Sequence, residues 1–146
     1  MIKIQINTVK FLVKKTLSVL ESCKLIGITL PRFCYHENLS IAGSCRMCLV
    51  EIYNTQKPIS ACSFPVLHNM KILTHSPLVM KAKENIATNL LLNHPLDCPI
   101  CDQSGECDLQ DQMKIHGGDS PKKNYIKRST QDKFFSTTIR KPLVIG

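Results

Sequence analysis

The chain has 146 residues, of which 43% are hydrophobic, 5% aromatic and 21% charged, with no tryptophan. This length suits one ordinary domain or two very small ones, and the chain has no apolar run near the roughly 20 residues of a membrane span and no low-complexity tract. The net charge of +8 predicts a solvated basic face, with docking on an acidic partner as the alternative. Nucleic-acid binding is not expected, because basic and aromatic residues are not interleaved.

The first predicted elements are a β-hairpin and a short helix. In the hairpin, two runs of alternating apolar and polar residues flank a turn at Asn7 and Thr8. The apolar positions of these runs are Ile2, Ile4, Ile6, Val9, Phe11 and Val13. The helix is expected to begin after an N-cap at Thr16, to contain Cys23 and to end at Gly27.

Short strands and one long loop follow. We expect a strand over 28–30 that stops at Pro31, and then a loop rich in Ser, Gly and Asn over 32–47. Further strands are predicted at 49–53, 58–62 and 71–74.

After residue 76 the spacing of apolar residues becomes helical. A helix over 77–94 is predicted, with Ser76 as its N-cap, Pro77 at its first position and Pro95 as its stop. Its apolar side is expected to carry Ala82, Ile86, Leu90 and Leu91, and its polar side Lys81, Lys83 and Glu84.

These changes of pattern predict three regions along the chain. The first is β-rich and covers 1–76, the second is a helix-and-loop region over 77–118, and the third is a basic tail over 119–146 that runs over a surface. The second region is expected to end in a short helix over 108–116, which Gly117 and Gly118 break.

Four of the eight cysteines form a first candidate ligand set: Cys34, Cys45, Cys48 and Cys62. The pair Cys45 and Cys48 can bind adjacent positions of one inorganic centre from a single turn, while the other two close around it from both sides. The small residues over 42–44 allow backbone N–H groups to turn toward sulfur. Such hydrogen bonds offset thiolate charge and raise a reduction potential.

A second candidate set consists of His94, Cys98, Cys101 and Cys107. His94 is expected on the apolar face of the long helix at its C-terminal end. Pro99 restrains the cysteine before it, and Gly105 allows the turn before Cys107. An imidazole in place of one thiolate removes a negative charge and should raise the potential of such a centre.

The remaining candidate ligands are expected to play no part in these centres. Cys23 is predicted to be a buried thiol, and His36 would crowd a set that is already complete. Three histidines lack partners at metal-ligand spacing: His68, His75 and His116. The acidic residues beside the second set are interpreted as solvated loop residues rather than catalytic carboxylates: Asp97, Asp102, Glu106 and Asp108.

Zinc remains open as an alternative, because four cysteines, or three with one histidine, also bind structural zinc. Zinc sites usually pair two short knuckles, however, and each set here has one C-x2-C. Disulfides are disfavoured, because the chain opens on a strand-like pattern rather than a secretory signal and its cysteines fall into ligand-like groups. On the zinc interpretation, the protein would be a structural docking module without electron transfer.

Three segments carry a resemblance to a known family: PRFCYHENLSIAGSCRMCLVEI, ACSFPV and NHPLDCPICDQSGECDLQDQ. They resemble the N-terminal part of the large iron–sulfur subunit of respiratory complex I, NADH:ubiquinone oxidoreductase. The resemblance implies an α+β fold, in which a ferredoxin-like β-grasp domain precedes a small helical module. It implies a [2Fe-2S] cluster on Cys34, Cys45, Cys48 and Cys62, and a [4Fe-4S] cluster on His94, Cys98, Cys101 and Cys107.

The resemblance also implies a role as an electron-transfer subunit in the peripheral arm, with no catalytic site on this chain. The implied partners are the flavin-bearing subunit and other subunits of that arm. Family members continue into a further cysteine cluster and a long molybdopterin-oxidoreductase-like region, which we expect here on a separate polypeptide.

The richness in Ile, Lys and Asn and the opening of the chain without a targeting segment are typical of an AT-rich organellar gene. We therefore expect the protein in the mitochondrion, in an inner-membrane complex on the matrix side. The cytoplasmic face of a bacterial inner membrane is the alternative. The closest functional rival is the similar module of an iron-only hydrogenase or a formate dehydrogenase, which normally shares one chain with a catalytic domain.

Overall fold

A computed structural model describes residues 1–92, 94–95 and 97–117. The predicted basic tail over 119–146 lies outside these residues. The chain divides into two compact units, Met1–Ile86 and a second one from Ala87 onward, and each is described by itself. The functional division at residues 76 and 118 stays a prediction.

The predicted hairpin is confirmed in the first unit. Strands β1 (Ile2–Ile6) and β2 (Val9–Val13) are antiparallel, with Ile2 opposite Val13 and Ile6 opposite Val9. Asn7 makes the turn with a φ of 53°, in the left-handed region that asparagine tolerates better than most residues.

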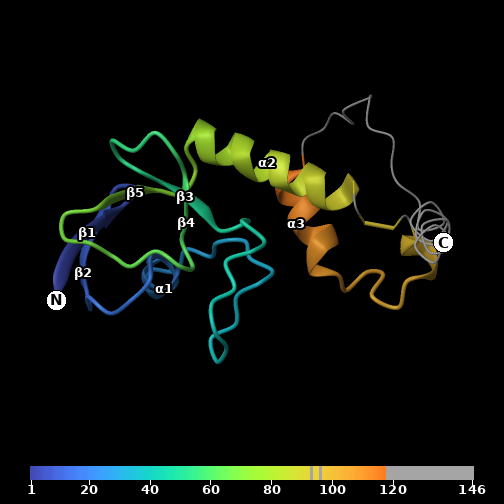
Figure 1. Cartoon of the computed structure of the whole chain (residues 1–146), viewed down its shortest axis with the longest axis horizontal. Helices are drawn as coiled ribbons and strands as arrows, with labels where there is room; N and C mark the ends of the chain where they lie inside the picture. The colour runs from blue at the N-terminus through green and yellow to red at the C-terminus, as the bar shows by residue number, and fades with distance from the viewer. Residues whose placement is uncertain (93, 96, 118–146) are drawn as a thin grey trace, which may run out of the picture. The chain divides into compact units, whose positions relative to one another are not determined.

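The hairpin belongs to a five-stranded mixed sheet with the order β2-β1-β5-β3-β4 (Figure 1). The remaining strands are β3 (Leu49–Ile52), β4 (Ile59–Ser60) and β5 (Lys71–Leu73). β1 pairs with β5 in parallel, and the other neighbours are antiparallel. The strands predicted from 49 and 71 are therefore present, each one residue shorter than expected, whereas the strand predicted at 58–62 is reduced to Ile59–Ser60.

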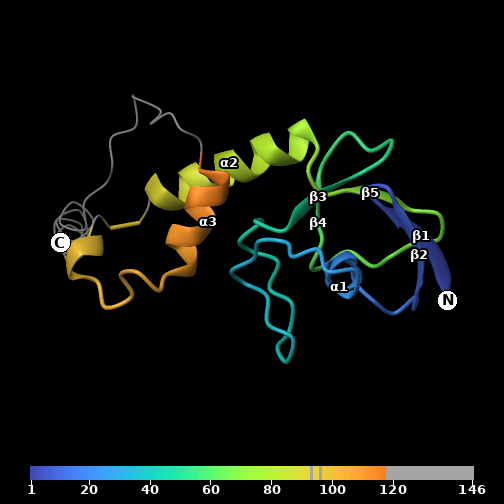
Figure 2. The same cartoon turned by 180° about the vertical axis from the view of Figure 1, so that it is seen from behind.

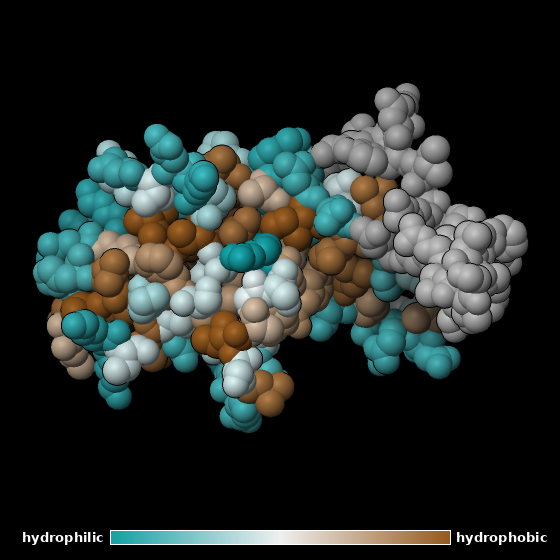
Figure 3. Space-filling model, viewed as in Figure 1, coloured by the Kyte–Doolittle hydropathy of each residue, from teal (hydrophilic) through white to brown (hydrophobic). Residues whose placement is uncertain are grey.

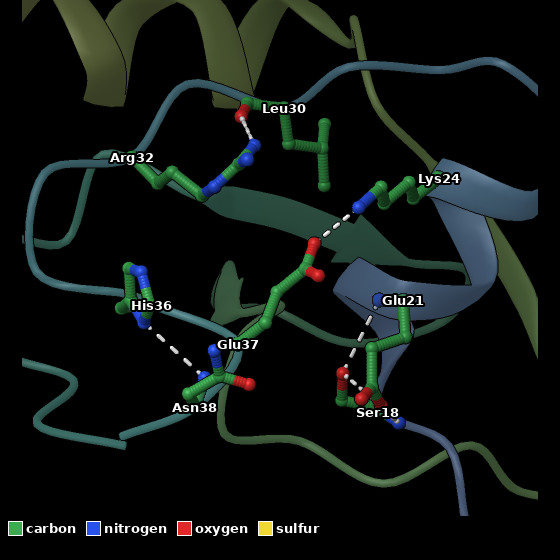
Figure 4. Close-up of polar contacts among 8 residues, drawn as sticks. All are labelled: Ser18, Glu21, Lys24, Leu30, Arg32, His36, Glu37 and Asn38. Carbon is green, nitrogen blue, oxygen red and sulfur yellow. Dashed lines mark hydrogen bonds and ion pairs between the residues drawn. The ribbon is translucent and has the colours of Figure 1, made fainter. Parts of the chain in front are cut away.

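Two predictions in this unit are wrong. The segment 28–30 forms no strand, because its backbone joins none of the paired strands, although Leu30 is buried. Helix α1 (Val19–Leu25) begins after Ser18 rather than Thr16. Ser18 and Glu21 form a capping box that satisfies two N–H groups at the start of the helix (Figure 4). Thr16 could not form such a box, because the residue three positions after it is Val19.

Helix α1 packs against the sheet, as both cartoon views show (Figure 1, Figure 2). The buried cluster combines sheet and helix side chains, among them Ile4, Ile6, Val50, Ile72, Val19 and Leu20. A mixed sheet covered by a helix, with further helices after it, confirms the α+β class. Apolar side chains also reach the surface, as the brown areas of Figure 3 show. The exposed large apolar residues of the first unit include Leu12, Leu25, Leu39, Ile41 and Leu67.

The long helix α2 (Pro77–Leu92) begins as predicted. The N–H of Val79 donates a hydrogen bond of 3.3 Å to Oγ of Ser76, and Pro77 occupies the first position. The assignment of Lys83 to the polar side is wrong. Lys83 lies one turn after Val79, and both are buried, whereas Lys81 is exposed.

In the second unit, a 3-10 turn η1 (Cys98–Ile100) precedes helix α3 (Asp108–His116), which has the predicted bounds and is followed by its C-cap Gly117. None of the helices in the described residues has both the length and the hydropathy needed to cross a bilayer.

Candidate metal centres

Two cysteines of the first set are positioned by neighbouring strands. Cys48 directly precedes β3, and Cys62 follows β4 by two residues. Because β3 and β4 are antiparallel, these positions meet at one end of the pair, where the N–H of Ala61 donates 3.1 Å to the carbonyl of Cys48. Both cysteines are almost fully buried. Burial first, and then the hydrogen bond and charge of Cys48, raise the pKa of Cys62 to about 12.

The other two cysteines come from the long loop. The N–H of Cys45 donates a hydrogen bond of 3.4 Å to Sγ of Cys34. Two residues around it adopt left-handed backbone conformations, Gly43 with a φ of 62° and Arg46 with a φ of 59°. Such a conformation is unusual for arginine, and strained residues of this kind gather at functional sites. The turn thus orients an N–H toward a sulfur, as the sequence predicted.

The acidity of Cys34 reflects this arrangement. Burial raises its pKa, but hydrogen bonds from Cys45 and Ser44 outweigh burial and lower the pKa to about 7. The loop therefore stabilises a thiolate at this position, which is the form that binds metal.

The structure brings all four cysteines of the first set into one neighbourhood. The charges of Cys48, Cys34 and Cys45 all act on Cys62. Four sulfurs with an N–H directed at one of them form a donor set that fits a thiolate-ligated iron–sulfur group. Within 1–92, 94–95 and 97–117, no three His, Cys, Asp or Glu side chains converge as ligands of a single metal ion.

The second set lies in the second unit, where its four members line one hollow: His94, Cys98, Cys101 and Cys107. The same hollow has an apolar wall that includes Leu91, Ile100 and Met113. Three thiols and one imidazole around an apolar hollow again fit an iron–sulfur group.

Local geometry explains how these ligands are presented. Pro99 occupies the 3-10 turn after Cys98, and Gly105 has a φ of 90°, which confirms the turn expected before Cys107. Cys107 is the N-cap residue of α3. The prediction that His94 lies on the helix face is wrong, because α2 ends at Leu92 and His94 follows it as an exposed residue.

Cys23 and His36 have local surroundings of their own, and their exclusion from the two ligand sets stays a prediction. Cys23 is fully buried in α1, and burial raises its pKa to about 11, although the charge of Lys83 lowers it in part. Nδ1 of His36 accepts the N–H of Asn38 at 3.2 Å (Figure 4), so it serves a local turn. The acidic residues beside the second set are all exposed: Asp97, Asp102, Glu106 and Asp108.

One residue near the first set was missed by the sequence reasoning. Lys83 is buried, and its charge interacts with Cys48 and Cys23. The sequence does contain one indication of this burial. Lys83 follows Val79 by four residues, which places both side chains on the same face of the helix.

Two families match the chain. Residues 1–77 match the family described as "2Fe-2S iron-sulfur cluster binding domain", and residues 84–121 match the "NADH-ubiquinone oxidoreductase-G iron-sulfur binding region". The first match covers more than half of the chain. These matches confirm the predicted [2Fe-2S] and [4Fe-4S] cofactors, one in each part of the chain.

Curated relatives are about half identical to this chain over the residues that match. A "NADH-ubiquinone oxidoreductase 75 kDa subunit" of Reclinomonas americana is 52% identical over 133 residues, which are 91% of this chain and 19% of the relative. A mitochondrial "NADH dehydrogenase [ubiquinone] iron-sulfur protein 1" of Solanum tuberosum is 53% identical over 83% of this chain and 16% of its own length. A bacterial relative from Rickettsia felis, which is named as part of an NADH-quinone oxidoreductase, is 48% identical over 96% of this chain and 21% of its own length.

The chain thus spans about a fifth of the length of these relatives. The relatives confirm the resemblance to the large iron–sulfur subunit of complex I. Among solved structures, an NAD+-reducing [NiFe]-hydrogenase in the H2-reduced state matches with a TM-score of 0.74 and 23% identity, over 88% of this chain and 55% of that chain. At this identity the likeness concerns the fold alone.

Proposed function

The chain belongs to the family of 2Fe-2S iron–sulfur cluster binding domains, and from this premise we propose that it is an electron-transfer module of NADH:ubiquinone oxidoreductase. The observation that carries the proposal is the presence of two separate sulfur-rich ligand sets, one in each compact unit. The relatives at about half identity carry complex I names, whereas the likeness to a hydrogenase is one of fold. Complex I is therefore preferred over the hydrogenase and formate dehydrogenase alternatives.

In this proposal the first set holds the [2Fe-2S] cluster. Cys34 and Cys45, which are joined by an N–H···S hydrogen bond, form the more exposed ligand pair. Cys48 and Cys62, which the β3–β4 pairing brings together, form the buried pair. The sheet order with a parallel contact between β1 and β5 and a helix on one face supports a ferredoxin-like β-grasp fold.

The second set holds the [4Fe-4S] cluster on His94, Cys98, Cys101 and Cys107. Its apolar wall lowers the local dielectric constant, and the neutral imidazole reduces the negative charge of the ligand set. The imidazole favours a higher reduction potential than four thiolates would give, whereas the apolar wall disfavours the added negative charge of the reduced cluster and acts in the opposite direction.

The contribution of this chain is to hold and tune the two redox groups. Bound clusters supply one-electron carriers. The buried pair Cys48 and Cys62 excludes water from one side of the first site, while the N–H of Cys45 stabilises negative charge at Cys34. The acidic residues near the second set are exposed and Asp108 opens α3, so we assign acid–base catalysis to other subunits. NADH oxidation and proton pumping are likewise assigned to other subunits of the proposed complex.

The expected setting is the peripheral arm on the matrix side of the mitochondrial inner membrane, or on the cytoplasmic face of a bacterial one. The flavin-bearing subunit, and a companion chain with the remaining part of the large iron–sulfur subunit, stay the predicted partners. Affinity purification of the tagged chain from its own cells, followed by mass spectrometry, tests both. Recovery without the flavin-bearing subunit would contradict this setting.

Metal analysis and low-temperature EPR test the cofactor assignment. The full chain, purified without oxygen, should hold about six irons, two in one cluster and four in the other, and should be brown. After dithionite reduction it should show two distinguishable EPR signals. Colourless protein with zinc and no signal would support the structural docking module instead.

A further inference from the structure

Lys83 occupies an unusual place for a lysine. It is 1% exposed, and among the described residues it is the only charged side chain in the buried class. It lies in the part of α2 that belongs to the first unit, and Figures 1 and 2 both show that α2 begins next to β3.

No carboxylate compensates this charge in the described part of the chain. The ion pairs there join Lys24 to Glu37, Lys81 to Glu84, and Lys114 to Asp111, and each includes exposed groups. An ammonium group taken out of water without a counter-charge is strongly unfavourable, so a buried lysine is normally paired. A charged Lys83 therefore needs an anion other than a carboxylate beside it.

Two sulfur groups act on Lys83, namely Cys48 and Cys23. Burial lowers the pKa of Lys83, and the charges of Cys48 and then Cys23 raise it. Cys23 is a poor counter-ion, because burial raises its pKa to about 11 and it remains a neutral thiol near pH 7. Cys48, which is equally buried and belongs to the first ligand set, is the better candidate.

We propose that Lys83 is the buried counter-cation of the [2Fe-2S] cluster, set beside its ligand Cys48, and that it raises the reduction potential of that cluster. This inference rests on the proposed ligand set. A cluster held by four thiolates is anionic, and it gains one more negative charge when it is reduced. A fixed positive charge therefore stabilises the reduced form more than the oxidised form, and the interior screens this attraction weakly.

The other cation near the ligands is less suited to this role. Arg46 lies between Cys45 and Cys48 in the sequence, but it is exposed, and its Nη1 donates to Oγ of Ser60 at 3.4 Å. Water and salt screen an exposed charge of this kind.

An EPR-monitored redox titration of the cluster-loaded full chain tests the proposal. Lys83→Met keeps the length of the side chain but removes its charge, Lys83→Arg keeps the charge, and Lys81→Met is the matched control on the exposed side of the same helix. At a fixed potential near the wild-type midpoint, Lys83→Met should lower the reduced-to-oxidised ratio of the [2Fe-2S] cluster at least tenfold, a shift of about 59 mV for a one-electron couple. Lys83→Arg and Lys81→Met should stay within about threefold of wild type.

Two internal controls separate charge from packing. The midpoint of the [4Fe-4S] cluster should not move in any of these variants, and Cys23→Ala should leave the first midpoint unchanged. An unchanged [2Fe-2S] midpoint in Lys83→Met would overturn the proposal, because a purely structural lysine alters stability without altering potential.

Failure to load the cluster is also informative. If Lys83→Met and Lys83→Gln lose the [2Fe-2S] signal while Lys83→Arg retains it, the charge is required and the proposal is supported. Loss in Lys83→Arg as well would overturn it, because shape rather than charge would then be limiting. Absence of the signal in the wild type would instead refute the proposed ligand set itself.

Discussion

The N–H of Cys45 donates a hydrogen bond to Sγ of Cys34 across the loop that carries both residues, at 3.4 Å. Ser44, the residue before it, also donates to the same sulfur and helps to lower the pKa of Cys34. This loop therefore directs several donors at one thiolate. Hydrogen bonds to ligand sulfurs raise the potential of a cluster, because they stabilise the added electron.

Ser44→Ala should lower the potential of the [2Fe-2S] cluster by removing the hydroxyl donor. One neutral hydrogen bond contributes about 1 kcal/mol, which corresponds to roughly 40 mV for a one-electron couple. Ser40→Ala, an exposed serine in the same loop, is the control. A redox titration that finds equal midpoints for both variants would remove Ser44 from the set of donors.

His94→Cys should keep a cluster in the second unit but lower its potential. The change adds one negative charge to the ligand set, and comparison with histidine-ligated Rieske centres indicates an effect on the order of 100 mV. His68→Ala is the control for loss of a histidine that is not a ligand, because His68 lies outside both sets. An unaltered midpoint for the [4Fe-4S] signal would take His94 off the ligand list.

Ser18→Ala should reduce stability by about 1 kcal/mol, because it removes the N-cap of α1 and half of the capping box. In a unit of this size, that loss lowers Tm by several degrees. Thr16→Ala, two residues earlier and exposed, should leave Tm unchanged. Thermal melts followed by circular dichroism distinguish the two, and a larger effect from Thr16→Ala would restore the cap that the sequence suggested.

Cys23 should make the free energy of unfolding decrease as the pH rises through the alkaline range. Burial raises its pKa from 9.0 to about 11, so the native state holds a proton that the unfolded state loses first. Its contribution is complete below pH 9 and falls as the pH rises through about 11. Wild type should therefore lose more stability than Cys23→Ala between these two pH values in denaturant titrations. Parallel curves for the two proteins would show that the thiol does not titrate with folding.

Removal of the clusters should destabilise both units. The loop over 32–47 forms no helix or strand, and it carries two of the four proposed ligands of the first cluster. Metal-binding free energy in such small units is largely folding free energy. Chelation under reducing conditions should therefore lower Tm sharply and broaden the transition. An apo-protein that melts like the loaded one would contradict this view.

Local signals in the sequence predicted much of the fold. The hairpin followed from strict alternation, α2 from Ser76 and Pro77 at its start, and α3 from its position between Gly105 and Gly117. These signals act between residues that are close together in the chain, so they can be recognised from one sequence without knowledge of the tertiary structure. The segment 28–30 shows the limit, because an apolar run becomes a strand only where a partner strand is available.

The burial of Lys83 could not be derived in the same way. Hydropathy assigns a lysine to the polar side of a helix, but the interior next to Cys48 and Cys23 is assembled by segments that lie far apart in the sequence. The position of His94 was missed for a local reason, because the helix ends two residues before it. The grouping of the cysteines did not depend on either point. Their spacing in the sequence was enough to assign them to the two sets that the structure brings together.

The parallel pairing of β1 with β5 has a consequence for the order of assembly. Ile6 is opposite Ile72, so the segment that carries Cys34, Cys45, Cys48 and Cys62 is enclosed between two strands that meet only when the later one is present. A nascent chain on the ribosome can display all four thiols while its first strand still lacks this neighbour. The contact between β1 and β5 can therefore form only after translation has passed Ile72, when all four cysteines of the first set have already been synthesised.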